Sequence, residues 1–153
     1  MVWLNNFQRV DSISNAHAGR EFEDSAYKYF QGLGIPVSKA VSVPCGVSDF
    51  KKQHVFDLGN TQEGSKVIIE CKSHRWTSGG NVPSAKLTVW NEAMYYFMAA
   101  PEGYRKVFFV LRDYCGKRGL TLAEYYVDKY KHLIPKDVEI WEYNQPNDTV
   151  KVI

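Results

Sequence analysis

The chain has 153 residues, 44% of them hydrophobic and 24% charged, with a formal net charge of +2. This length suits a single domain with a buried core, and so small a net charge does not by itself indicate a nucleic-acid-binding protein. No apolar run reaches the roughly 18 residues that span a bilayer, and the N-terminal residues lack the features of a secretory signal. The three cysteines have no CxxC spacing, which argues against a disulfide framework or a zinc site. We therefore expect a cytoplasmic protein with no membrane partner.

We interpret residues 1–153 as one domain, because the sequence contains no repeat, low-complexity tract or linker. Residues 1–14 are expected to form an N-terminal arm. A helix is predicted at about 17–31, where Phe22, Ala26 and Phe30 recur at helical spacing. Three predicted strands follow at 37–43 (ended by Pro44), 54–58 and 66–72. A second helix is capped by Ser84 and ends before Pro101, and a strand at 106–112 follows it. A third helix, capped by Thr121, ends near residue 130, and the last predicted strand is at 138–143. This order, αβββαβαβ, predicts a mixed α/β (α+β) fold.

The most informative segment is Glu70-Cys71-Lys72, which closes the strand at 66–72, while Asp57 lies at the end of the strand before it. Side chains alternate along a strand, so Glu70 and Lys72 are expected on the same face. The turn-rich segment 59–65 predicts a hairpin that brings Asp57 beside them. Two carboxylates suit Mg²⁺, which accepts one or two carboxylates together with waters and phosphate oxygens. The alternative interpretation is an exposed hairpin whose Glu70 and Lys72 form a weak ion pair.

The helix at 17–31 contributes one more acidic side chain. Glu23 lies beside the apolar stripe of this helix, whereas Glu21 lies further round. Glu23 is therefore the better candidate to face the sheet. The alternative is that it serves only as an acid near the start of a helix, where the helix dipole favours negative charge.

The order Gly19-x-x-x-Glu23 on a helix, then Asp57, then Glu70-x-Lys72 resembles the PD-(D/E)XK nuclease superfamily. This superfamily includes type II restriction endonucleases, archaeal Holliday junction resolvases and several repair nucleases. The resemblance covers roughly residues 15–143 as an order of elements. It departs from the superfamily pattern in the residue before Asp57, which is phenylalanine rather than proline. The resemblance implies a restriction endonuclease-like core, in which helices flank a mixed central sheet.

The resemblance also implies a function, that of a Mg²⁺-dependent endonuclease of restriction or homing type that hydrolyses DNA phosphodiester bonds, with Mn²⁺ as a substitute. By analogy, Asp57, Glu70 and the backbone carbonyl of Cys71 would hold the metal, and Glu23 would reach it through a water or a second ion. Lys72 would act electrostatically on the transition state, because an ordinary lysine is a poor general base at neutral pH.

Four further residues are candidates for nucleic-acid binding. Arg75 and Trp76 follow the proposed catalytic strand directly, Lys86 starts the second helix, and Lys52 precedes the Asp57 strand. Basic groups near a metal site can contact a phosphate backbone. The alternative for each basic residue is a solvated surface charge. The histidines form no ligand-spaced pair, so we interpret His74 as structural or solvent-facing and expect His54 to face away from Asp57.

Two other functions remain open at this point. For the restriction- or homing-type enzyme, a chain this short that cuts both strands would require at least a homodimer. A structure-specific resolvase or repair nuclease would use the same core and chemistry. A catalytically silent nucleic-acid-binding module is the third possibility. It would be favoured if Glu23 lay far from the two strand carboxylates.

Overall fold

The computed structural model describes the backbone of residues 2–153 and the side chains from residue 15 onward. Its centre is a six-stranded mixed sheet with the strand order β1-β2-β3-β4-β7-β8. The strands of this sheet are β1 (Ser38–Cys45), β2 (Lys52–Asn60), β3 (Val67–Lys72), β4 (Arg105–Leu111), β7 (Val138–Asn144) and β8 (Thr149–Val152). Strands β3, β4 and β7 run parallel, and the outer pairs are antiparallel. The mixed α/β class expected from the sequence is therefore confirmed.

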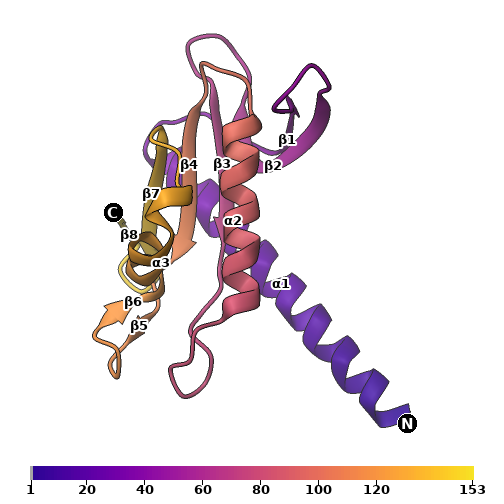
Figure 1. The fold of residues 1–153 in the computed structure, drawn as a ribbon, viewed down its shortest axis with the longest axis vertical. Helices are drawn as coiled ribbons and strands as arrows, with labels where there is room; N and C mark the ends of the chain where they lie inside the picture. The colour runs from indigo at the N-terminus through magenta and orange to yellow at the C-terminus, as the bar shows by residue number, and fades with distance from the viewer. Residues whose placement is uncertain (1) are drawn as a thin grey trace.

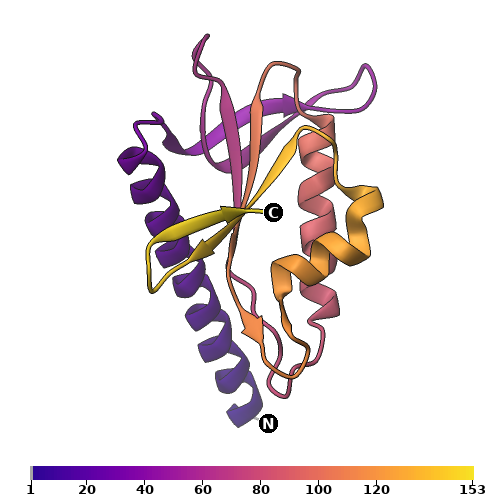
Figure 2. The ribbon, with the colours of Figure 1, turned by 90° about the vertical axis from the view of Figure 1, so that its left-hand side faces the viewer.

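Helices cover both faces of the sheet, as Figures 1 and 2 show. Helix α1 (Val2–Gly32) lies on one face, while α2 (Ser84–Ala99) and α3 (Leu122–Tyr130) lie on the other, and the short η1 (Lys131–Leu133) follows α3. Two strands of two residues, β5 (Tyr114–Cys115) and β6 (Leu120–Thr121), form a separate hairpin after β4. Among the described residues, no helix is both long and apolar enough to cross a membrane.

The alternation of side chains along the strands divides the core into two clusters. Val67, Ile69 and Cys71 of β3 pack on the α1 side, whereas Ile68 packs on the side of α2 and α3. On the α1 side, the Phe30 ring stacks on Trp141, with the ring centroids 5.1 Å apart. Every residue of β4 after Arg105 is buried, as expected of a central strand covered on both faces.

Several element boundaries differ from those predicted. Helix α1 begins at Val2, so the backbone of residues 2–14 is helical where we expected an arm, and the side chains of that segment lie outside the described residues. Pro44 does not end β1 but lies within it, which is tolerated because β1 is an edge strand. Pro83, not Ser84, occupies the N-cap of α2, and no side chain caps that end.

Other boundaries follow the prediction more closely. Thr121 caps α3 as expected, in a capping box with Glu124. Strand β8 and the β5–β6 hairpin were not predicted. Both are short, and the apolar pattern that indicates strands needs several residues to be recognised.

The position of Asp57 results from an irregularity in β2. The pairing of β2 with β3 ends at Leu58, which lies opposite Ile69. Leu58 packs in the cluster on the α1 side, yet Phe56, two residues earlier, packs in the cluster on the α2 side. Ala40, which lies across from this point on β1, has a φ of 54°, in the left-handed region that non-glycine residues rarely adopt. Strand β2 therefore rotates at Asp57 and separates from β3 there.

Candidate functional site

A cavity of about 540 Å³ lies where β2 separates from β3. One wall is α1, and the other is the segment that leaves β3 and enters α2. The charged side chains that line it are Glu23 from α1, Asp57 from β2, Lys72 from β3, and Arg75 and Lys86 from the opposite wall. The sequence-predicted residues Glu23, Asp57, Cys71 and Lys72 are thus brought together by α1, β2 and β3.

Asp57 is held by the backbone of the neighbouring strand. Its Oδ2 accepts a hydrogen bond from the N–H of Cys71 over 2.8 Å. This bond occupies an N–H of β3 beyond the last β2–β3 pair. The carboxylate is therefore fixed at the mouth of the gap between the two strands, with a defined orientation toward the cavity.

Glu23 is the acidic residue of α1 that reaches the site. Its side chain is half-buried and lines the cavity with Asp57. Burial and, after it, the adjacent carboxylate of Asp57, with which Glu23 can share a proton, raise the pKa of Glu23 to about 7. Glu21, in contrast, is exposed and pairs with His17 at 3.0 Å. The structure therefore places Glu23, and not Glu21, at the site.

Glu70 lies on the other side of the gap. It is only 7% exposed, and its carboxylate lies 3.6 Å from His54 Nε2 and 3.7 Å from Lys72 Nζ. Burial raises its pKa, and the hydrogen bond from His54 opposes that rise. A smaller hollow of about 110 Å³ between Glu70 and α2 is lined by His54 and Tyr96, whose rings stack 3.6 Å apart.

This arrangement differs from the single face that a regular hairpin would give. The rotation of β2 turns Asp57 toward the cavity beside α1, while Glu70 keeps the direction that strand alternation assigns to it. Lys72 lines both hollows. His54 lies on the α2 side, away from the cavity that Asp57 lines, as we expected from the sequence. Its contact with Glu70 was missed, because local spacing does not reveal a contact across strands.

The acidic side chains present hard oxygen ligands, the type that Mg²⁺ prefers. Glu23 and Asp57 lie together, and the charge of Glu70 also raises the pKa of Glu23. Within the described residues, no group of three or more His, Cys, Asp or Glu side chains converges as a complete metal site. Glu23 and Asp57 do not form a closed protein cage, and they would supply two carboxylates to an ion that keeps several of its waters, as Mg²⁺ usually does.

Two of the four residues predicted to bind nucleic acid line the cavity, namely Arg75 and Lys86. Both are exposed, and Arg75 lies 3.6 Å from Asp113. Lys52 begins β2 opposite Cys45, five residues before Asp57, which corresponds to roughly 16 Å along a strand. Lys52 is therefore separated from the cavity.

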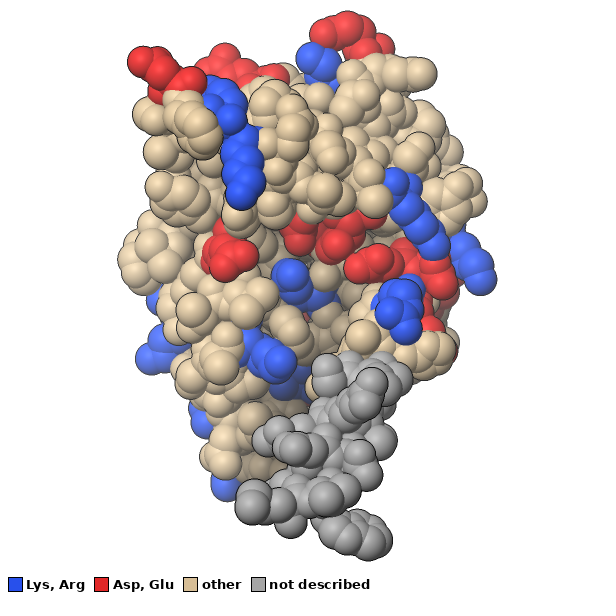
Figure 3. Space-filling view, turned by 90° about the vertical axis from the view of Figure 1, so that its right-hand side faces the viewer, with Lys and Arg blue, Asp and Glu red and all other residues tan. Residues whose placement is uncertain are grey.

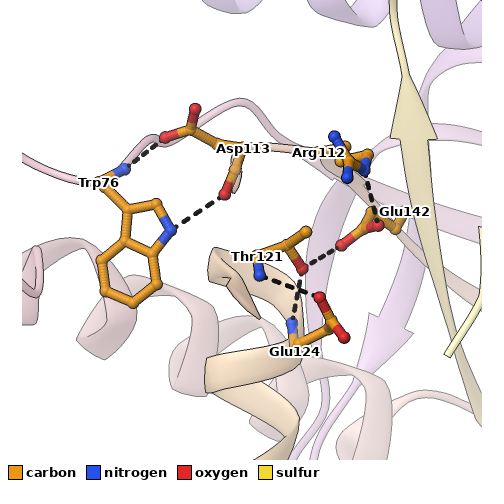
Figure 4. A network of polar contacts seen from close by, with 6 residues as sticks. All are labelled: Trp76, Arg112, Asp113, Thr121, Glu124 and Glu142. Carbon is orange, nitrogen blue, oxygen red and sulfur yellow. Dashed lines mark hydrogen bonds and ion pairs between the residues drawn. The ribbon is translucent and has the colours of Figure 1, made fainter. Parts of the chain in front are cut away.

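The hydrogen bonds and packing of Trp76 indicate a structural role. Its backbone N–H donates to the Asp113 carboxylate over 2.7 Å, and its indole N–H donates to the Asp113 carbonyl over 3.0 Å (Figure 4). The indole also packs edge-on against Tyr125. With its N–H groups occupied and one edge covered, Trp76 anchors the loop that carries Arg75.

The β5–β6 hairpin contacts and stabilises the loop that carries Arg75. Arg118 donates from Nε to the carbonyl of Gly80 over 2.6 Å and lies over the Trp76 ring, 5.0 Å from its centroid. The base of the hairpin is fixed in turn, because the Thr121 hydroxyl donates to the buried carboxylate of Glu142 (Figure 4). The loop wall of the cavity is thus tied to the sheet.

His74, which we expected to be structural or solvent-facing, also lies at the site. This residue lines the cavity, and its Nδ1 accepts a hydrogen bond from the indole N–H of Trp90 over 2.7 Å. Burial, together with the charges of Lys86 and Lys72, lowers the pKa of His74 to about 4. The signal available in the sequence was only its position two residues after Lys72, since the contact with Trp90 depends on the packing of α2.

The face of the molecule that includes α1 carries both signs of charge. Figure 3 shows acidic side chains across the middle of this face, with basic side chains beside and below them.

Comparison of the chain with protein-family models, with curated proteins and with solved structures finds no match in any of the three. Functional inference therefore depends on the geometry of the site and on the motif resemblance.

Proposed function

We propose that this protein is a Mg²⁺-dependent endonuclease that hydrolyses phosphodiester bonds in DNA, and that its core is of the restriction endonuclease-like type. The observation that carries the proposal is the meeting of Glu23 and Asp57 in a cavity that Lys72 also lines. Acidic metal ligands beside a fixed cation are what phosphodiester hydrolysis needs, because the metal and the lysine act on the same phosphoryl group.

Several acidic residues would coordinate the ion together. Asp57 and Glu70, with the backbone carbonyl of Cys71, are the ligands that the resemblance implies, and Glu23 lies close enough to Asp57 to join them directly or through a water. When bound, Mg²⁺ would polarise a phosphoryl oxygen and lower the pKa of an attached water. The Lys72 ammonium, 3.7 Å from Glu70, would offset the negative charge that develops on the phosphoryl oxygens.

The opposite wall would bind the substrate backbone. Arg75 and Lys86 present two exposed cations at the cavity, and contacts of this kind to phosphates position a nucleic acid without reading its sequence. The anchoring of the loop through Trp76 and Arg118 supports this role, because a wall fixed in advance loses less entropy when it binds a ligand.

A catalytically silent binding module fits this site less well. Such a module would have no use for two neighbouring, partly buried carboxylates, whose mutual repulsion costs free energy when no cation is bound. A structure-specific nuclease remains the alternative that shares the chemistry, and only the preferred DNA form separates it from a restriction- or homing-type enzyme. A single active site cuts one strand, so cleavage of both strands would require a homodimer.

The test is cleavage of supercoiled plasmid and of branched DNA in Mg²⁺ or Mn²⁺ by the wild-type protein and by Lys72→Ala and Asp57→Asn. We expect metal-dependent cleavage by the wild type and a loss of at least about a hundredfold in each variant, the size typical of losing an electrostatic catalytic group. Cleavage that survives in both variants would show that the site is wrongly assigned. Absence of cleavage by the wild type on every substrate would refute the proposal.

A further inference from the structure

His74 is held in a defined orientation by a fully buried neighbour. Trp90 is 0% exposed, its indole N–H donates to His74 Nδ1 over 2.7 Å, and the two rings lie at 28° to each other. Because Trp90 belongs to the core of α2, the position of its N–H is fixed by packing. The imidazole of His74 is therefore directed by the core and not by solvent.

This contact determines where His74 carries its proton. The indole nitrogen of tryptophan can only donate, so Nδ1 must be unprotonated and the proton lies on Nε2. Protonation of both nitrogens would bring two donors face to face. Burial and the nearby cations Lys86 and Lys72 also disfavour the charged form and lower the pKa of His74 to about 4. At neutral pH the side chain is thus an uncharged donor with a single N–H available.

The Nε2–H group of His74 makes no hydrogen bond within the described part of the protein. Among the described residues, no group accepts a hydrogen bond from His74 Nε2, although the residue lines the cavity together with Lys72 and Lys86. A histidine with only a structural role would need Nδ1 alone, as the acceptor for Trp90. Other residue types could serve that role at position 74. A donor presented in the same cavity as two lysines favours an anionic acceptor.

We propose that His74 is a substrate-contacting residue, whose Nε2–H donates to a non-bridging phosphate oxygen of the DNA backbone in a subsite shared with Lys72 and Lys86. This inference rests on the proposed function. It assigns to His74 a contact of a different kind from those of the lysines, because the bond is directional and adds no charge.

The difference in charge gives a specific experiment. The affinity of the protein for a short fluorescein-labelled DNA duplex is measured by anisotropy in Ca²⁺ at several salt concentrations. A lysine that contacts phosphate contributes to the slope of log K against log salt, so Lys86→Ala should reduce that slope by about 1. His74→Leu should weaken binding by about tenfold to a hundredfold, the range for a hydrogen bond to a charged group, with the slope unchanged.

His74→Gln provides the matched control. Its amide oxygen can accept from Trp90 while its NH₂ donates into the cavity, so binding within a few-fold of the wild type is expected. If the wild type binds the duplex and His74→Leu binds it with the same affinity, the inference is overturned while the proposed function remains intact. A wild-type protein that does not bind the duplex would overturn both.

A second measurement needs no variant, in case His74→Leu does not fold. Long-range ¹H–¹⁵N correlation spectra of the wild-type protein should show His74 at neutral pH with the proton on Nε2, and the Nε2 resonance should shift when the duplex is added. A proton on Nδ1, or an Nε2 resonance unaffected by bound duplex, would contradict the inference.

Discussion

The carboxylate of Asp57 accepts the backbone N–H of Cys71 over 2.8 Å, at the point where β2 leaves β3. A group proposed to bind a metal therefore also completes the hydrogen bonding of the sheet. Substitutions at Asp57 must separate these two roles before a loss of activity can be interpreted.

Asp57→Asn and Asp57→Ala make that separation. Asparagine retains an oxygen that can accept from Cys71 and removes the repulsion with Glu23, so we expect Asp57→Asn to be at least as stable as the wild type while losing metal-dependent activity. Alanine removes the acceptor and leaves the buried N–H unpaired, which should cost about 1–3 kcal/mol. Urea unfolding and cleavage assays measure the two effects. Equal stability of the two variants would contradict the proposed structural role.

The raised pKa of Glu23 predicts an unusual dependence of stability on pH. In the folded protein this pKa is about 7, above the ordinary value of 4.5, so between these values the folded state binds more protons than the unfolded state. The free energy of unfolding contributed by Glu23 is then full below about pH 4.5 and is lost as the pH rises through 7.

Glu23→Gln removes this dependence, because glutamine carries no charge at any pH. In metal-free buffer we expect the variant to be more stable than the wild type at pH 8, by on the order of 1 kcal/mol once solvent screening of this half-buried group is allowed for. At pH 5 the two should be nearly equal. Adding Mg²⁺ at pH 8 should stabilise the wild type and have much less effect on Asp57→Asn. Thermal unfolding at the two pH values measures each comparison, and a stability difference that does not change with pH would refute the coupling.

Thr121 should contribute to stability through two contacts at once. It caps α3, with its hydroxyl accepting from the Glu124 N–H, and the same hydroxyl donates to the buried Glu142. Loss of an N-cap costs about 0.5–2 kcal/mol, and the weakened pairing of Glu142 adds to that cost. We therefore expect Thr121→Ala to lower the free energy of unfolding by about 2–3 kcal/mol. Thr121→Ser keeps the hydroxyl and should lose less than half as much in the same urea titration.

Sequence patterns predicted the parts of this fold that depend on local periodicity. The alternation in β3 predicted Glu70 and Lys72 on one face, where both line the smaller hollow, and the capping residue Thr121 located the start of α3. The helical stripe favoured Glu23 over Glu21, as the structure does. Each of these features is decided by a few neighbouring residues, so the sequence contains the information directly.

The parts that were missed depend on contacts between distant segments. The rotation of β2 at Asp57 accompanies an unusual backbone conformation at Ala40 on the neighbouring strand, and alanine gives no sign of a positive φ. Trp76 was expected at the substrate, but Asp113, which accepts both of its N–H groups, lies 37 residues away. His74 appeared unremarkable for the same reason, since its partner Trp90 lies on another element.

Gly19 offers a test of where the substrate enters. It lies on α1 at the wall of the cavity, and a Cβ added there would meet no atom within 4 Å. The protein's own packing therefore does not require glycine at this position. Gly19→Ala should raise the free energy of unfolding by up to about 1 kcal/mol, because alanine favours the helical backbone.

Gly19→Leu separates stability from access to the cavity. Leucine is nearly as good a helix former as alanine, so the variant should be at least as stable as the wild type in urea unfolding. Its longer side chain would project into the space beside Glu23 and Asp57, and we expect it to reduce DNA cleavage by tenfold or more, roughly the cost of one lost contact to a charged group. Gly19→Ala is the control, with a smaller effect on cleavage. Full activity in Gly19→Leu would mean that the substrate does not occupy the cavity beside α1.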